Sequence, residues 1–318
     1  MLDPGGIKKK DSSAFRRWER AFRISNIGKG SIIQNVLHQG ILLLDKEAGV
    51  TSRRIDNLLQ KRFQTKKVGH LGTLDPFATG LLVVAVGKAT KCLPYLEADF
   101  KTYQAILKLG EKTSTGDPEG EVILKKAPRP HPEEEVRACL ESFLGFSEQL
   151  PPMTSAIKID GVPLYKKARK GIEVERKRRR IEVRSIRLLS LQGDLIFFQA
   201  SVSAGTYMRS LGEDIAEKLG EAGHLSSLRR TEVGSFSLSQ AKRIDEIVEG
   251  DFLSPGPLLN MRKIQVEGKR KEDVKNGKPL ILEGESAPQI ALLDGEEPLA
   301  VYSYSEQKQA YVCLRGLF

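Results

Sequence analysis

The chain has 318 residues, of which 40% are hydrophobic and 29% charged, and 51 Lys and Arg outweigh 41 Asp and Glu. This length and composition suit one large soluble domain or two, while the net charge of +10 points to a polyanionic partner, most simply nucleic acid, with an anionic membrane second. No apolar run reaches the roughly 18–20 residues of a membrane helix. Three distant cysteines without a Cys-x-x-Cys pair and four scattered histidines support neither a zinc cage nor a disulfide framework, so we expect no metal and a reducing cytoplasm.

Residues 1–38 form a basic N-terminal extension, with eight Lys and Arg against three acidic residues. A loosely docked tail and an RNA-contacting arm both remain open for it. Gly40–Lys46 is predicted to be a buried strand, and Ser52 to cap a helix over about 53–63 whose apolar positions share one face. Lys46, at the end of that strand, is interpreted as structural, with contact to the substrate as the alternative.

A glycine-rich stretch at 69–80 follows, with the pattern G-H-x-G-x-L-D-P-x-A-T-G. The flanking β-branched and apolar runs predict a loop between two buried strands. The proline after Asp75 stiffens the backbone there, so one carboxylate is held beside a strand end with His70 and Thr73 close by. The alternative is a plain turn in which Asp75 caps local backbone groups.

The segment from Lys166 to Arg187 is the most basic in the chain, with eleven Lys and Arg against three Glu. It includes Arg179 and Arg180 in an uninterrupted basic run. Such a run is often only a solvated face, but this density favours a surface that binds phosphates. Residues 111–131 are rich in turn formers and are expected to be a surface excursion.

From about residue 261 the charge becomes nearly balanced, and short apolar runs alternate with turns. This pattern indicates a small β-rich domain. The other predicted elements are a short helix at 89–96, a strand at 101–109, a helix at 132–144, a strand at 195–203, a helix reaching about 219, a β-hairpin arm at 225–236, and a short helix with a linker at 241–260.

Four segments together resemble the TruB-type tRNA pseudouridine synthases: the 69–80 pattern, G-x-x-x-x-D-K-x-x-G-x-T-S upstream, the Gln149–Lys158 run, and G-T-Y-M-R at 205–209. The chain departs from the usual pattern at Glu47, where proline is common, and at Met208. The resemblance implies an α/β (α+β) pseudouridine synthase fold, with a mixed, mostly antiparallel central sheet flanked by helices. It also implies a catalytic domain at 39–250 and a small β-rich PUA-like domain at 251–318.

The resemblance also implies roles for individual residues. Asp75 would be the catalytic residue, Tyr103 a general-base candidate that packs against the target base, and Arg209 the partner that keeps Asp75 ionised and in place. Tyr207 would lie beneath the base. The other side chains expected to contact the substrate are His70, Thr73, Lys46, Tyr207, Leu228, Arg179, Arg180, Arg229 and Arg230.

The implied activity is isomerisation of the T-loop uridine at position 55 of tRNA to pseudouridine, with the base flipped out of its stack. This reaction is redox-neutral, so no cofactor is expected. Asp75 could act as a nucleophile at C1′ or assist glycal formation. Two alternatives are a guide-RNA-dependent rRNA pseudouridine synthase and a tRNA-folding chaperone in which catalysis is secondary. The expected partner is the tRNA T-arm, bound by a monomer without an obligate protein partner.

Overall fold

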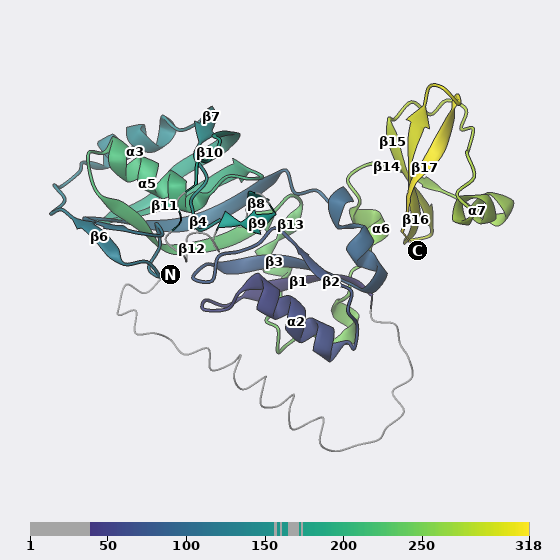
Figure 1. Ribbon diagram of the computed structural model, residues 1–318, viewed down its shortest axis with the longest axis horizontal. Helices are drawn as coiled ribbons and strands as arrows, with labels where there is room; N and C mark the ends of the chain where they lie inside the picture. The colour runs from purple at the N-terminus through teal and green to yellow at the C-terminus, as the bar shows by residue number, and fades with distance from the viewer. Residues whose placement is uncertain (1–38, 156–157, 160, 165–171, 173, 318) are drawn as a thin grey trace, which may run out of the picture. The chain divides into compact units, whose positions relative to one another are not determined.

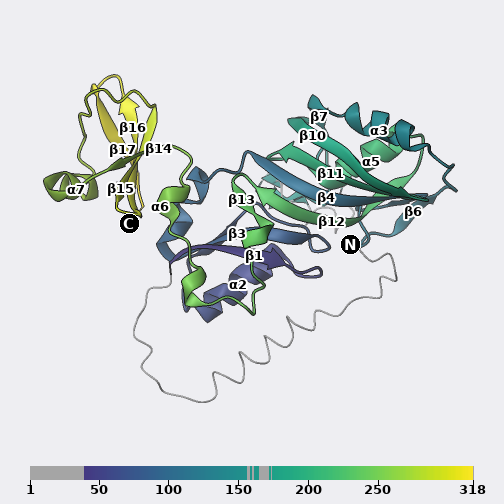
Figure 2. The same cartoon turned by 180° about the vertical axis from the view of Figure 1, so that it is seen from behind.

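The computed structural model describes residues 39–155, 158–159, 161–164, 172 and 174–317. The described chain forms two compact units (Figures 1 and 2), composed of residues 39–74, 82–97 and 240–317 and of residues 75–81 and 98–239. The predicted N-terminal extension, residues 1–38, and the residues from Lys166 to Gly171 in the basic run lie outside the described residues.

The largest sheet is mixed. Its strands follow one another in the order β1 (Gly40–Lys46), β3 (Thr79–Val86), β12 (Gly223–Val233), β4 (Phe100–Leu109), β11 (Leu195–Ser203), β10 (Arg179–Gln192) and β7 (Gly145–Gln149), with β2 (Val68–Leu71) on β3 and β13 (Phe236–Ser237) on β12. β12 runs parallel to β3 and antiparallel to β4, and β4, β11, β10 and β7 continue as an antiparallel series. This confirms the predicted mixed, mostly antiparallel sheet.

In the first unit, helix α2 (Ser52–Arg62) packs on the sheet through its apolar face, which carries Ile55, Leu58 and Leu59 (Figure 1). The prediction that Ser52 caps this helix was wrong by one residue. Thr51 is the N-cap, and its side chain accepts the Arg54 amide. The short helix predicted at 89–96 is present as two 3₁₀ turns, η1 (Gly87–Lys91) and η2 (Leu93–Tyr95).

In the second unit, helices α3 (Glu133–Glu141) and α5 (Met208–Lys218) lie on the same side of the antiparallel strands (Figures 1 and 2). The strand pattern explains why, because alternate residues of β11 are fully buried while their neighbours are partly exposed. Ile196, Phe198 and Ala200 form the buried row. The helices cover this apolar face.

Two predictions of local structure were wrong. Leu225–Phe236 is not an arm, because β12 occupies a central position between β3 and β4, and only the short β13 turns back on it. The stretch at 111–131 contains a hairpin of β5 (Glu111–Thr113) and β6 (Val122–Lys125), and it also contains the buried residue Asp117. It is therefore only partly a surface excursion.

The C-terminal part of the first unit contains a separate four-stranded sheet, as the sequence predicted, with a core around Tyr302 and Tyr311. No helix within the described ranges is long and apolar enough to cross a membrane. The elements from residue 238 are η3 (Leu238–Gln240), η4 (Glu249–Asp251), α6 (Pro255–Leu258), β14 (Arg262–Gln265), α7 (Gly268–Lys275), β15 (Gln289–Asp294), β16 (Glu297–Ser305) and β17 (Ala310–Gly316). Earlier in the chain, a two-stranded ribbon of β8 (Lys158–Ile159) and β9 (Val162–Pro163) precedes β10.

Candidate active site

Asp75 lies in the loop that joins β2 to β3, and hydrogen bonds hold the backbone before and after it. Before it, the Ser52 hydroxyl accepts the Leu74 amide at 3.0 Å and donates to the Leu74 carbonyl at 3.2 Å. After it, the Asp75 carbonyl accepts the Ala78 amide at 3.1 Å. The Asp75 side chain is 33% exposed. The loop therefore presents a fixed carboxylate that a ligand can reach.

Arg209, at the start of α5, forms a bidentate pair with Asp75. Its Nε donates to Asp75 Oδ2 at 2.8 Å and its Nη2 donates to Asp75 Oδ1 at 3.2 Å. Arg209 is only 4% exposed, so the pair is shielded on the arginine side and open on the carboxylate side. Two parallel charge-assisted bonds fix orientation as well as distance. The predicted partners Asp75 and Arg209 thus lie in direct contact.

Three further groups surround the Arg209 guanidinium, and sequence reasoning had assigned a role to none of them. Nη1 donates to the Thr115 carbonyl at 2.8 Å and to the Thr154 hydroxyl, and lies 3.5 Å from Asp117 Oδ2. Asp117 is 5% exposed, and Thr115 donates to its carboxylate. The guanidinium therefore bridges two carboxylates, of which only Asp75 is accessible. The only sequence signal for Asp117 was an Asp-Pro turn pattern.

Gly80, the last residue of the central motif, permits the close approach of β3 to β12. Its φ is +101°, and a Cβ there would lie 2.2 Å from the Arg230 carbonyl oxygen, so no side chain fits. Arg230 is opposite Gly80 on one side and Tyr103 on the other. Tyr103 is 7% exposed and Leu228, on the adjacent strand, 4%. The register thus places both predicted base contacts on neighbouring strands.

Lys101 shares the Tyr103 face of β4, two residues away. Burial and the nearby Arg230 charge lower the pKa of Lys101 from 10.5 to about 8. The unfolded chain holds this proton up to about pH 10.5, so from pH 8 to 10.5 unfolding takes up protons and the stability of the folded state rises with pH. Below pH 8, the folded protein carries the full cost of a buried ammonium.

Lys101→Met should therefore stabilise the protein at pH 7, by on the order of 1–3 kcal/mol, and the gain should shrink towards pH 10. Urea unfolding at both pH values measures this difference. Lys108→Met is the matched control on the same strand, because Lys108 pairs with Glu111 at 2.7 Å and its removal should not stabilise. An equal gain from Lys101→Met at both pH values would contradict the assigned cause.

Tyr207 immediately precedes α5 and is its N-cap residue, two positions before Arg209.

His70, in the first unit, has hydrogen-bond partners at both ring nitrogens. Its Nδ1 lies 2.9 and 3.0 Å from the Asp56 carboxylate oxygens, and its Nε2 lies 3.1 Å from the Thr73 hydroxyl. Asp56 is buried at 1% exposure. This carboxylate orients the ring of His70, and sequence reasoning had missed it because Asp56 read as one polar position of a helix.

Two side chains that the resemblance places against the substrate are buried in the structure, which agrees with the structural interpretation of Lys46 and corrects the expectation for Arg230. Lys46 is 1% exposed and its ammonium donates to the Val50 and Glu47 carbonyls, so it stabilises a turn. Arg230 is fully buried, and its Nε donates to the Leu81 carbonyl inside the sheet. Neither side chain is at a surface that RNA could reach in this structure. Arg229 is half-buried, with Nη1 3.3 Å from the Thr79 hydroxyl.

Arg179 and Arg180, in contrast, are exposed on β10. The Arg180 guanidinium lies over the ring of Phe146, 4.1 Å from its centroid, and Arg184 lies over Phe100 at 3.2 Å. Phe146 is itself 63% exposed. Stacked arginines next to an exposed ring form a surface suited to phosphates and bases.

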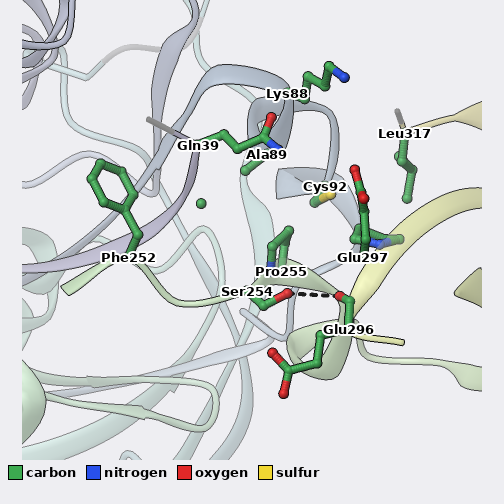
Figure 3. A pocket seen from close by; sticks show the side chains of 12 residues that line it. Gln39, Lys88, Ala89, Cys92, Phe252, Ser254, Pro255, Glu296, Glu297 and Leu317 are labelled. Carbon is green, nitrogen blue, oxygen red and sulfur yellow. Dashed lines mark hydrogen bonds between the residues drawn. The ribbon is translucent and has the colours of Figure 1, made fainter. Parts of the chain in front are cut away.

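A cavity of about 360 Å³ in the first unit contains none of the site residues predicted from the sequence (Figure 3). Phe252, Cys92 and Glu297 are among its lining residues, and the Ser254 hydroxyl donates to the Glu296 carbonyl at 2.8 Å. Burial raises the pKa of Cys92 to about 11. The thiol therefore stays protonated at neutral pH and is a poor nucleophile.

Comparisons with known sequences identify the family of the chain. Residues 60–208 match the TruB family pseudouridylate synthase N-terminal domain, and residues 209–251 match the tRNA pseudouridylate synthase B C-terminal domain. The tRNA pseudouridine synthase B of Geobacter sulfurreducens is 43% identical over 249 residues, which are 76% of this chain and 82% of the relative. That of Bordetella avium is 46% identical over 212 residues, covering 65% of this chain and 86% of the relative.

Solved structures share the fold at lower identity. A chain from the "Crystal Structure of a Cbf5-Nop10-Gar1 Complex" has a TM-score of 0.66 at 24% identity, covering 89% of this chain and 86% of its own length. A chain from the "Structure of H/ACA RNP bound to a substrate RNA containing 2'-deoxyuridine" has a TM-score of 0.64 at 22% identity, covering 91% and 88%. The fold is that of the pseudouridine synthases, which are isomerases. Within that class, the chain belongs to the TruB family of pseudouridylate synthases.

Proposed function

We propose that this protein is a tRNA pseudouridine synthase that converts the T-loop uridine at position 55 to pseudouridine. The observation that carries the proposal is the partly exposed Asp75 carboxylate, held at 2.8 and 3.2 Å by the buried Arg209. Relatives named tRNA pseudouridine synthase B support tRNA as the substrate.

In the proposed reaction, Asp75 is the nucleophile. Its carboxylate attacks C1′ of the target nucleoside, the C1′–N1 bond breaks, and the uracil leaves with the bonding electrons. The uracil then rotates, C5 bonds to C1′, and Asp75 is released. Tyr103 is the proposed acceptor of the C5 proton, directly or through water, and N1 takes up one proton from water, so the product has the same number of protons as the substrate. The base is isomerised without a change in atoms or oxidation state, so the reaction needs no energy source.

The target base must leave its stack before Asp75 can reach C1′. We place the flipped base against Tyr103 and Leu228, which are buried on adjacent strands, with Tyr207 beneath it. His70 lies in β2, where Asp56 and Thr73 hold its ring, and we propose that it also contacts the RNA.

We assign phosphate contacts to Arg179 and Arg180, which are exposed on β10, and a peripheral contact to the half-buried Arg229. These charges would make binding depend strongly on salt. The proposed domain limits are a catalytic domain at 39–250 and a PUA-like domain at 251–318, which carries the separate C-terminal sheet. The basic segment 1–38 would add to the attraction for RNA.

The decisive experiment incubates the protein with an unmodified T-arm hairpin and no guide RNA, followed by mapping of pseudouridine. We expect conversion of the single uridine equivalent to position 55, and none when cytidine replaces it. A guide-dependent rRNA enzyme would give no product on this substrate. Absence of product with tight, salt-sensitive binding retained would refute the proposed guide-independent catalysis and favour the guide-dependent or the chaperone alternative.

A further inference from the structure

Gln149, the last residue of β7, has its side-chain amide paired with the backbone of one residue. Its Oε1 accepts the Tyr207 amide at 2.7 Å, and its Nε2 donates to the Tyr207 carbonyl at 3.1 Å. Gln149 is 4% exposed. A buried amide that satisfies both polar groups of a single peptide residue acts as an added strand rung and fixes that residue in position and direction.

The residue that Gln149 fixes, Tyr207, lies at the start of the helix that carries Arg209. Tyr207 is the N-cap of α5, and its side chain accepts no amide of the first turn, so Gln149 supplies the side-chain hydrogen bonds at this end of the helix. The preceding turn contains Gly205 at φ +90°, a conformation that offers little stiffness of its own. Arg209 follows two residues later, within the same helical turn. Any shift of the Tyr207 backbone is therefore passed to the guanidinium that holds Asp75.

The loop after Gln149 makes further contacts with the same end of α5. The Ser210 hydroxyl donates to the Leu150 carbonyl at 3.4 Å, and Arg209 Nη1 donates to the Thr154 hydroxyl. The contacts differ in quality and target. The Ser210 contact is a single long bond, whereas Gln149 makes two shorter bonds to Tyr207, the residue from which the helix starts. Through Gln149, β7 therefore fixes the position of the first residues of α5.

We infer that Gln149 is a positioning residue for the isomerisation, acting through Tyr207 to hold Arg209 and Asp75 in reactive alignment. It touches no reacting atom. This inference rests on the proposed function for its kinetic consequence, while its structural consequence at Tyr207 stands independently.

The kinetic test is Gln149→Met, which keeps side-chain length and removes both hydrogen bonds. We expect kcat to fall about 10- to 100-fold, as misplacement of catalytic groups by about 1 Å does, while overall RNA affinity, which rests mainly on phosphate contacts, stays nearly unchanged. Ser210→Ala is the matched control at the same helix end, and its kcat should stay within about twofold because it loses only one long bond and keeps both bonds to Tyr207.

A second variant, Gln149→Glu, separates positioning from simple loss of packing. The carboxylate can accept the Tyr207 amide but repels the Tyr207 carbonyl, whereas the protonated acid can donate to that carbonyl. Its kcat relative to wild type should therefore recover as the pH is lowered, which a packing defect would not do. Normal kcat for Gln149→Met, or equal losses in Ser210→Ala and Gln149→Met, would overturn the inference.

Amide hydrogen exchange at Tyr207 supplies a readout that does not need catalysis. We expect protection in the wild type, retained in Ser210→Ala and reduced at least about tenfold in Gln149→Met. Unchanged protection would refute the inference whatever the activity. If the wild type forms no pseudouridine, the proposed function fails, and the exchange result alone then decides whether Gln149 positions Tyr207.

Discussion

Asp75→Asn is expected to abolish pseudouridine formation on the T-arm hairpin, with a loss in rate of at least about 10⁴-fold. Asparagine has nearly the same shape and can still accept a bond from Arg209, but its neutral amide is not a nucleophile. The structure makes this substitution informative because the backbone around Asp75 is held by Ser52 and by the Ala78 turn. The loss should therefore reflect chemistry and not misfolding.

Single-turnover kinetics and hairpin affinity, measured together, test this expectation. RNA affinity should remain the same or rise slightly, because the variant removes one negative charge near a polyanion. Asp75→Glu is the control that keeps the charge and moves it by one methylene, and it should also be strongly impaired. Product from Asp75→Asn at more than a tenth of the wild-type rate would exclude Asp75 as nucleophile.

The same variant weighs the chaperone alternative. An Asp75→Asn protein that binds tRNA normally but does not isomerise it separates folding from catalysis. Full restoration of tRNA maturation and growth in a strain lacking the enzyme would make the chaperone activity the essential one. Failure to restore either would make the isomerisation essential.

The Asp75–Arg209 contact could be predicted, but only because two distant motifs resembled one family. The residues are 134 positions apart, and no periodicity or spacing relates them. Local patterns predicted β1, β4 and β11 well because buried strands carry apolar alternation in their own sequence. The assignment of β12 to an arm failed because its position between β3 and β4 depends on long-range pairing through Gly80.

The burial of two cations could not be predicted from the sequence. The resemblance implied substrate contacts for Lys46 and Arg230, yet backbone carbonyls accept hydrogen bonds from both side chains inside the fold. The roles of Asp117 and Gln149 were missed for a different reason. Each looks like an ordinary polar residue of a turn or strand end, and its role appears only when α5 brings Arg209 or Tyr207 against it.

Arg209→Lys tests whether the bridged pair of carboxylates depends on geometry or on charge alone. The guanidinium has donors in a fixed fork, and it uses them on Asp75, the Thr115 carbonyl and the Thr154 hydroxyl while lying 3.5 Å from Asp117. A lysine ammonium keeps the positive charge but is a single point on a shorter reach, so it cannot serve all of these partners. We expect kcat to fall about 10²- to 10³-fold, comparable to loss of a fixed electrostatic contact.

The buried carboxylate of Asp117 should matter less for activity than the arginine that it contacts. Asp117 is also held by Thr115 and by the Glu119 amide at 3.0 Å, so Asp117→Asn should cost less activity than Arg209→Lys. Arg209→Met should also destabilise the fold, by about 3–5 kcal/mol, because it leaves a buried carboxylate without its cation. Urea unfolding and single-turnover rates of the three variants give the order. Equal activity of Arg209→Lys and wild type would mean that charge suffices, because the bidentate geometry would then contribute nothing to the alignment of Asp75.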